Sequence, residues 1–110
     1  MRTSTSPTPI PIRRALRDIG NNLQAWRKLR GLTQSQLADR AAVARTTVIR
    51  LEQDNGNVSL ENTLRVLNAL GILENLPSAV DPYETDLGRL RADEQLPVRV
   101  RPRSFGSDDA

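Results

Sequence analysis

Polar side chains suited to hydrogen bonding with nucleic acid bases recur along one stretch of the chain. If residues 44–53 form an α-helix, with about 100° between successive residues, Ala44, Val48 and Leu51 fall on one side. The opposite side, a sector of about 140°, carries Arg45, Thr46, Arg50 and Gln53, with Ile49 among them. Arginine can donate two hydrogen bonds to guanine, glutamine can pair with adenine, and a threonine methyl group can contact thymine. This face fits a surface that reads base edges, and it also fits an ordinary solvated helix face.

The composition excludes several kinds of site. The 110 residues contain no cysteine and no histidine, so the chain has no disulfide, thiol nucleophile, imidazole base or Cys/His zinc site. We interpret the carboxylates of the C-terminal third as a charge run and not as a metal or acid–base site; they are Asp81, Glu84, Asp86, Asp93 and Glu94. We therefore expect no enzymatic activity, no cofactor and no metal.

Length and hydropathy limit the architecture. A chain of 110 residues supports one small hydrophobic core with flanking segments. No apolar run approaches the roughly 18 residues that cross a bilayer, and the N-terminal stretch lacks the apolar segment of a signal peptide. We expect a cytoplasmic protein without membrane contact.

Charge is distributed unevenly along the chain. Residues 1–50 carry ten Lys or Arg and two Asp or Glu, whereas residues 51–96 carry three and nine. A basic half beside an acidic half suggests a polyanion on one face and a different partner, or a second copy, on the other. Solvated surface with a bias toward arginine is the alternative interpretation.

Local patterns predict four helices within about sixty residues, and thus an all-α bundle. The first helix is amphipathic and ends near Arg30 and Gly31; its apolar residues are Ile12, Leu16, Ile19, Leu23 and Trp26. Because Gly20 costs about 1 kcal/mol relative to alanine, we expect the stable part of this helix to begin near Asp18.

The other boundaries follow from capping residues. Thr33 and Gln36 form a Thr-x-x-Gln capping box that predicts the start of a second helix. Ser59 predicts the N-cap of a later helix that Gly71 closes. Beyond it, the sequence predicts one or two short helices broken by prolines, and an edge strand near the C-terminus. These last features are Pro77, Pro82 and residues 96–101.

The stretch between the capping box and the turn after residue 53 has two interpretations. Its apolar residues recur four, three, four and three apart, which fits one continuous helix of a coiled-coil adaptor; they are Leu37, Ala41, Ala44, Val48 and Leu51. Two short helices that meet the same core from either side of a turn would also place these residues in contact. Periodicity is compatible with both.

Residues 19–72 resemble the lambda-repressor-like helix-turn-helix domains of the XRE/Cro family. The matching features, in order, are Gly31-Leu32-Thr33-Gln34, Leu37-Ala38, Val43, Thr47-Val48, Leu51-Glu52 and Leu70-Gly71-Ile72. The resemblance implies a bundle of four to five helices in which the second helix stops near Arg40-Ala41 and the third begins at Arg45. The family commonly has glycine where this chain has Ala42, and a capping residue where it has Ala44. We therefore expect burial of Val43 to hold the turn.

The resemblance also implies roles for individual residues. The positions that read bases in the family correspond to Arg45, Thr46 and Arg50, with Thr47 at the edge of the groove. Gln34, Gln53 and Asn55 correspond to phosphate-binding positions. Arg27 and Glu52 occupy positions that often form a salt bridge, which we assign to the scaffold.

The function implied is that of a sequence-specific regulator of transcription that binds double-stranded DNA. Such a protein would bind an inverted-repeat operator as a homodimer in the nucleoid. We expect a disordered arm over residues 1–11, the DNA-binding domain over 12–76, a dimer or partner-binding extension over 77–101 and a disordered tail over 102–110. Arg13, Arg14 and Arg17 could reach phosphates or a groove, or lie in solvent. Arg99, Arg101 and Arg103 could contact DNA or an acidic partner.

The segment DPYETDLGRLRADEQLPVRVR resembles the tails of small XRE proteins encoded beside HipA-like kinases. This second resemblance implies a HipB-like antitoxin that represses its own operon and binds a HipA-like toxin. A stand-alone XRE-type repressor without a toxin partner is the alternative.

Overall fold

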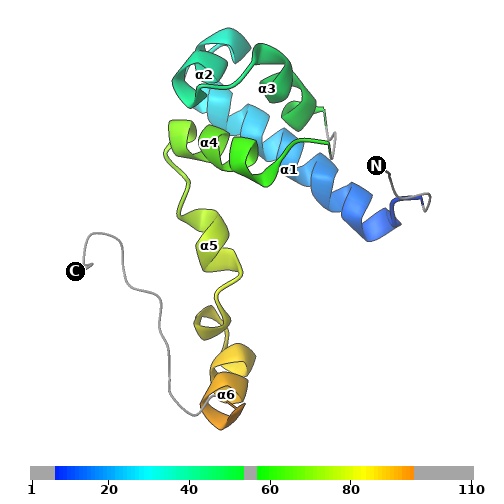
Figure 1. The fold of residues 1–110 in the computed structure, drawn as a ribbon, viewed down its shortest axis with the longest axis vertical. Helices are drawn as coiled ribbons and strands as arrows, with labels where there is room; N and C mark the ends of the chain where they lie inside the picture. Colours follow the sequence, from blue (N-terminus) through cyan, green and yellow to red (C-terminus); the bar gives the residue numbers. More distant parts are fainter. Residues whose placement is uncertain (1–6, 54–56, 96–110) are drawn as a thin grey trace. The chain divides into compact units, whose positions relative to one another are not determined.

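The computed structural model describes residues 7–53 and 57–95, which form six α-helices and one 3-10 turn, with no strand among them. This confirms the predicted all-α class. The chain divides into two compact units, Met1–Leu73 and Glu74–Ala110 (Figure 1). The first unit contains α1 (Ile10–Leu29), α2 (Gln34–Ala41), α3 (Arg45–Glu52) and α4 (Leu60–Leu70). The second contains α5 (Asn75–Ala79), η1 (Pro82–Glu84) and α6 (Asp86–Gln95).

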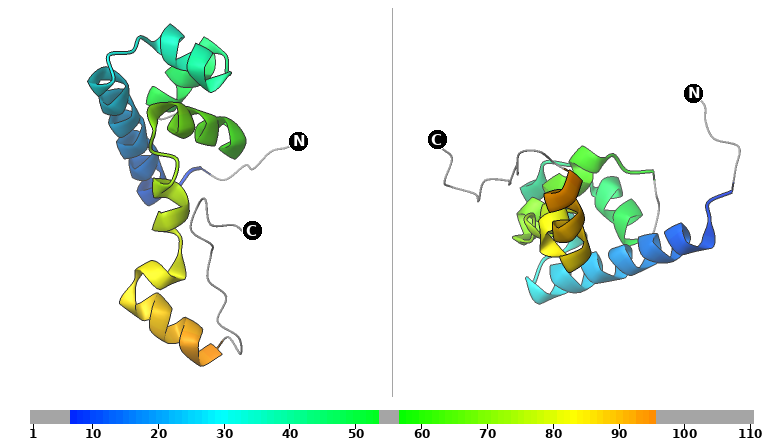
Figure 2. Two further views of the ribbon diagram at one scale, coloured as in Figure 1. Left: turned by 90° about the vertical axis from the view of Figure 1, so that its left-hand side faces the viewer. Right: turned by 90° about the horizontal axis from the view of Figure 1, so that it is seen from below.

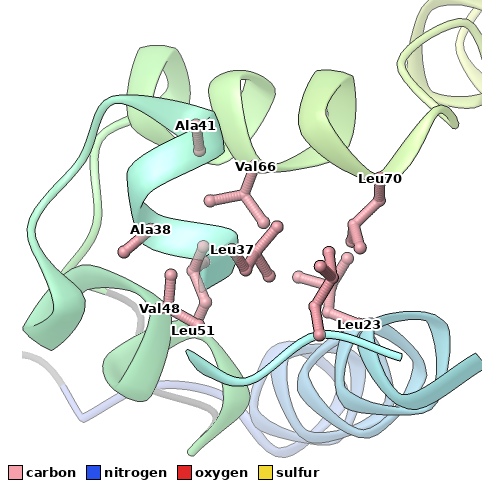
Figure 3. Close-up of a cluster of buried hydrophobic side chains, with 9 residues drawn as sticks. Leu23, Leu37, Ala38, Ala41, Val48, Leu51, Val66 and Leu70 are labelled. Atoms are coloured by element: carbon pink, nitrogen blue, oxygen red, sulfur yellow. The ribbon is translucent and has the colours of Figure 1, made fainter. Parts of the chain in front are cut away.

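All four helices of the first unit contribute to one hydrophobic core (Figure 3). Its fully buried side chains are Leu37 of α2, Val48 of α3, and Val66 and Leu70 of α4, and Leu23 joins them from α1. The helix α2 packs against both α3 and α4, while α1 packs against α3. The core therefore fixes the orientation of α3, whose buried side determines which side chains face outward.

The helix α1 is longer than the sequence predicts. It begins at Ile10 and continues without a break through Gly20, which is buried, so the expected start of the stable part near Asp18 is wrong. Pro9 precedes the helix, and its carbonyl accepts the amides of Ile12 and Arg13 at 3.1 and 3.0 Å. Proline is compatible with a helix start because the amides of the first turn have no intrahelical partner. The N-terminal half of α1 extends beyond the other helices of its unit (Figure 2).

A turn separates α2 from α3, so the single continuous helix and the coiled-coil adaptor are wrong. Ala42 adopts a left-handed conformation with φ +57° and ψ +44°. The amides of Ala42 and Val43 donate to the carbonyls of Asp39 and Ala38, at 3.2 and 3.0 Å. This pair of bonds is the Schellman motif that commonly ends helices. Val43 is partly buried against the core.

The same motif ends α1 and α4. The left-handed residue there is glycine, Gly31 with φ +70° and Gly71 with φ +81°. The following residues, Leu32 and Ile72, pack on the core as Val43 does. These two ends confirm the predicted glycine caps. Ala42 is the one residue other than glycine with positive φ among the described residues, which identifies the α2–α3 turn as a locally strained helix end.

Helix starts follow the predicted caps where the sequence offers them. Thr33 and Gln36 form the capping box of α2, with hydrogen bonds of 3.1 and 2.9 Å. The Ser59 hydroxyl accepts the Asn62 amide at the start of α4. Ala44, at the N-cap of α3, has no side chain that could accept a hydrogen bond. The α2–α3 junction thus lacks both a glycine at its left-handed residue, Ala42, and a capping side chain at Ala44.

The second unit consists of short helices. Pro77 lies inside α5 and does not break it, since it occupies the first turn, where its missing amide is not required. Pro82 begins η1. In α6, Gly88 lies so close to the Pro82 carbonyl that a Cβ would overlap its oxygen. The predicted strand near residues 96–101 lies outside the described residues. Among the helices that the structure describes, none is long and apolar enough to span a membrane.

Candidate nucleic-acid interface

The outward side of α3 carries the residues predicted to read bases. Arg45, Thr46 and Arg50 are exposed, and Thr47 is partly buried at the margin of this face. On the opposite side Val48 and Leu51 are 1% and 8% exposed. Burial of the apolar side fixes the rotation of the helix about its own axis, so the polar set is presented as one surface. Ile49, which lies among the polar residues, is partly buried.

A network of three side chains anchors the end of α3. Arg27 Nε and Nη2 donate to Glu52 Oε2 and Oε1 at 2.6 and 3.1 Å, and Arg27 Nη1 donates to the Leu32 carbonyl at 2.9 Å. The Arg27 and Glu52 side chains are 10% and 3% exposed. This confirms the predicted salt bridge. Because its geometry is bidentate, it fixes both the distance and the orientation between α1 and α3.

Gln34, the first residue of α2, belongs to the same network. Its Nε2 donates to Glu52 Oε1 at 3.1 Å, a contact that the sequence analysis did not anticipate. The two residues are eighteen positions apart, and only the packing of α2 on α3 brings them together. A glutamine amide has two N–H donors, so this bond leaves one N–H for a ligand. Glu52 thereby positions the predicted phosphate-binding side chain.

The backbone at the start of α2 offers further donors. The capping box occupies the amides of Thr33 and Gln36. The amides of Gln34 and Ser35 belong to the first turn and have no intrahelical acceptor. With the positive end of the helix dipole, such amides favour an anion.

The remaining predicted phosphate contacts flank the end of α3. Gln53 is its C-cap residue and is exposed, and its amide donates to the Ile49 carbonyl at 3.0 Å. Asn55 lies outside the described residues. The structure therefore brings Arg45, Thr46, Arg50 and Gln53 onto one helix and places Gln34 at the adjoining end of α2.

Comparison with known proteins agrees with this geometry. Residues 23–74 match the helix-turn-helix family. Over 54 residues the chain is 43% identical to the immunity repressor protein of Bacillus phage phi105. The matched stretch covers 49% of this chain and 38% of the repressor, so the chain spans well under half of that relative's length.

The family match falls on the part of the chain that folds as α2, the Ala42 turn and α3, together with all of α4 and the end of α1. Two helices joined by a turn, α2 and α3, lie within the matched residues, in agreement with the family's description. The first unit is an all-α bundle that contains the residues matched by the helix-turn-helix family, and its architecture is consistent with a lambda-repressor-like bundle.

Proposed function

We propose that this protein is a non-enzymatic repressor of transcription that binds a specific sequence of double-stranded DNA through α3. The observation that carries the proposal is the exposed set of Arg45, Thr46 and Arg50 on a helix whose other side is locked into the core. A helix of this size fits the major groove, where each base pair presents a distinct set of donors and acceptors. The similarity to a phage immunity repressor supports the same function.

The residues divide into two roles. The arginines at 45 and 50 have the donor geometry that guanine accepts in two parallel bonds, and Thr46 and Thr47 offer a methyl and a hydroxyl group to neighbouring bases. Gln34, Gln53 and Asn55 would contact phosphates, which sets the position of α3 in the groove without reading sequence. In this arrangement Glu52 acts through Gln34.

We propose further that the protein acts as a homodimer on an inverted repeat and is associated with the nucleoid. One recognition helix reads only a few base pairs. Two copies of α3 about 34 Å apart, one from each protomer, would double the number of base pairs that are read. The acidic second unit is the segment that would supply the dimer contact or hold another protein. In this unit Leu87 and Leu90 of α6 are 63% and 56% exposed.

An antitoxin role is a second candidate that the same unit favours. Residues 74–95 carry six Asp or Glu and two Arg, and exposed leucines three positions apart on α6 offer an apolar strip within this acidic surface. A HipA-like kinase toxin is the partner that the tail resemblance implies, and a stand-alone repressor is the alternative. Replacement of both leucines by glutamate should abolish co-purification of such a kinase from the native host, and should leave DNA binding unchanged.

The DNA-binding proposal is tested by selecting duplexes from a random library with the full chain, and by measuring affinity with fluorescence anisotropy. Arg45→Ala and Arg50→Ala should each cost roughly 1–3 kcal/mol of specific affinity and relax the preference at one base pair. Arg65→Ala is the matched control, since Arg65 is exposed on α4 and pairs only with Glu61 among the ion pairs observed. If no duplex is enriched, or if both arginine variants bind the selected site as tightly as the control, the proposal is wrong.

A further inference from the structure

The exposed side of α1 carries a row of positively charged side chains that are separate from the polar face of α3. On a helical wheel Arg13, Arg14, Arg17 and Lys28 fall within a sector of about 100°, and all four are exposed. Asn21 and Gln24 also lie in this sector, and so does the exposed Ile10 at the start of α1. The single acidic residue of α1, Asp18, falls outside it. We call these four residues the basic ridge.

The basic ridge lies next to the side of α1 that contacts α3. Arg27, which binds Glu52 at the end of α3, falls about 40° from the edge of the ridge on the same wheel. Leu23, which points into the core, is farther round the helix. A ligand that contacts α3 could therefore extend past Arg27 to the basic ridge.

The N-terminal part of the ridge borders an open hollow at the surface. Arg13, Arg14 and Arg17, together with Ile10, line a hollow of about 210 Å³. Guanidinium groups donate from a planar fork that matches two oxygens of a phosphate group. Three of them around one hollow fit an anionic ligand with several oxygens.

The dimensions of the ridge favour a linear polyanion. Residues 13 and 28 are fifteen positions apart, which at about 1.5 Å per residue is roughly 22 Å along the helix. This length corresponds to about six steps of a DNA strand at about 3.4 Å each. A bilayer surface would require several apolar side chains to accompany the cations. Among the exposed isoleucines of α1 only Ile10 does so, since Ile12 and Ile19 lie on the opposite side.

We propose that the basic ridge binds the phosphate backbone of duplex DNA outside the base pairs that α3 contacts. The inference rests on the proposed function, because it assigns the same duplex a second, sequence-independent contact. It identifies Arg13, Arg14 and Arg17 as phosphate ligands, on a helix that begins thirteen residues before residue 23, where the family match begins. The ridge would add affinity without altering which bases are preferred.

The test is the salt dependence of binding to a labelled duplex of about 30 base pairs with the selected site at its centre. Each phosphate contact contributes about 0.9 to the slope of log affinity against log salt concentration, so R13Q/R14Q/R17Q should lower the slope by about 2.7. Between 50 and 200 mM salt the variant should lose roughly 40-fold less affinity than the wild type. The same change is expected with a duplex of random sequence.

Two controls separate local contact from net charge. R65Q/R89Q/R91Q removes the same number of charges from α4 and α6 and should change the slope much less. On a duplex trimmed to the base pairs that α3 protects, the wild type and R13Q/R14Q/R17Q should have equal slopes. Circular dichroism checks that each variant keeps its helix content.

The outcomes distinguish the inference from the proposed function. If the wild type binds no duplex, the proposed function fails. If the wild type binds and R13Q/R14Q/R17Q retains the wild-type slope, or if the control variant lowers it equally, the inference is wrong and α3 remains the DNA-binding element. Loss of binding to anionic phospholipid vesicles, with an unchanged slope on DNA, would assign the ridge to a membrane surface and would also overturn the inference.

Discussion

Replacement of Ala42 by glycine should stabilise this protein. Ala42 ends α2 with φ +57°, in a conformation that costs a residue with a Cβ about 1–2 kcal/mol. Glycine avoids this cost, but it loses about 0.5–1 kcal/mol more conformational entropy on folding. The difference predicts a gain of about 0.5–1 kcal/mol in the free energy of unfolding. The hydrogen bonds of the Schellman motif are made by the backbone and are unchanged by the substitution.

The gain is large enough to measure by thermal and urea denaturation followed by circular dichroism. For a domain of 60–100 residues, 1 kcal/mol shifts Tm by roughly 4–8 °C. Ala42→Gly should therefore raise Tm by about 2–8 °C. The urea m-value should remain unchanged, because the surface buried on folding is the same.

Gly31→Ala provides the mirror-image control. Gly31 occupies the same position at the end of α1 with φ +70°, and an added Cβ there would meet no atom within 4 Å. Its substitution should lower stability by about 0.5–1 kcal/mol for conformational reasons alone. Gly71 is less suitable, because a Cβ there would lie 2.9 Å from the Arg30 guanidinium.

Ala15→Gly provides the opposite control, since Ala15 is exposed on α1 in an ordinary helical position. It should cost about 1 kcal/mol, the usual difference between alanine and glycine within a helix. If Ala42→Gly destabilises the protein as Ala15→Gly does, then Ala42 bears no conformational strain, and our explanation of the α2–α3 turn is refuted.

Three further substitutions probe the same region by urea denaturation. Ala44→Ser adds a side-chain acceptor at the N-cap of α3 and should stabilise by about 1 kcal/mol; equal stability of this variant and the wild type would show that α3 gains nothing from a side-chain cap. Val43→Asp places a carboxylate against the core and should abolish both folding and DNA binding. If the variant folds and still binds DNA, burial of Val43 does not hold the turn. Glu52→Gln leaves a buried arginine without its counter-charge and should cost roughly 3 kcal/mol, compared with at most about 0.5 kcal/mol for Glu61→Gln in the exposed pair with Arg65.

Helix boundaries were predictable where a residue satisfies backbone groups in its own turn. Thr33 and Ser59 accept amides three positions ahead, and Gly31 and Gly71 adopt the left-handed conformation that closes a helix. These interactions are local, and their residue types are restricted by chemistry. The outward face of α3 was predictable for a related reason, because helical periodicity separates its polar residues from Val48 and Leu51.

Other features required the tertiary structure. Propensity favours a helix that continues through Ala42 and Ala44, and only the resemblance to a known family predicted a turn there. Burial of Leu37 on one side and Val48 on the other, with Val43 packed between α2 and α3 against the core, outweighs that local preference. The bond from Gln34 to Glu52 joins residues that no sequence pattern pairs.

By itself, the sequence determined an all-α chain, most of its caps, and a polar helix face suited to bases. The tertiary structure decided where the chain bends, that the side-chain amide of Gln34 donates to Glu52, and that α1 begins as early as Ile10. The physical reason is the range of the interactions. Caps and periodicity act within one or two turns, whereas the strained conformation of Ala42 and the network around Glu52 exist only because burial of distant apolar residues outweighs their local cost.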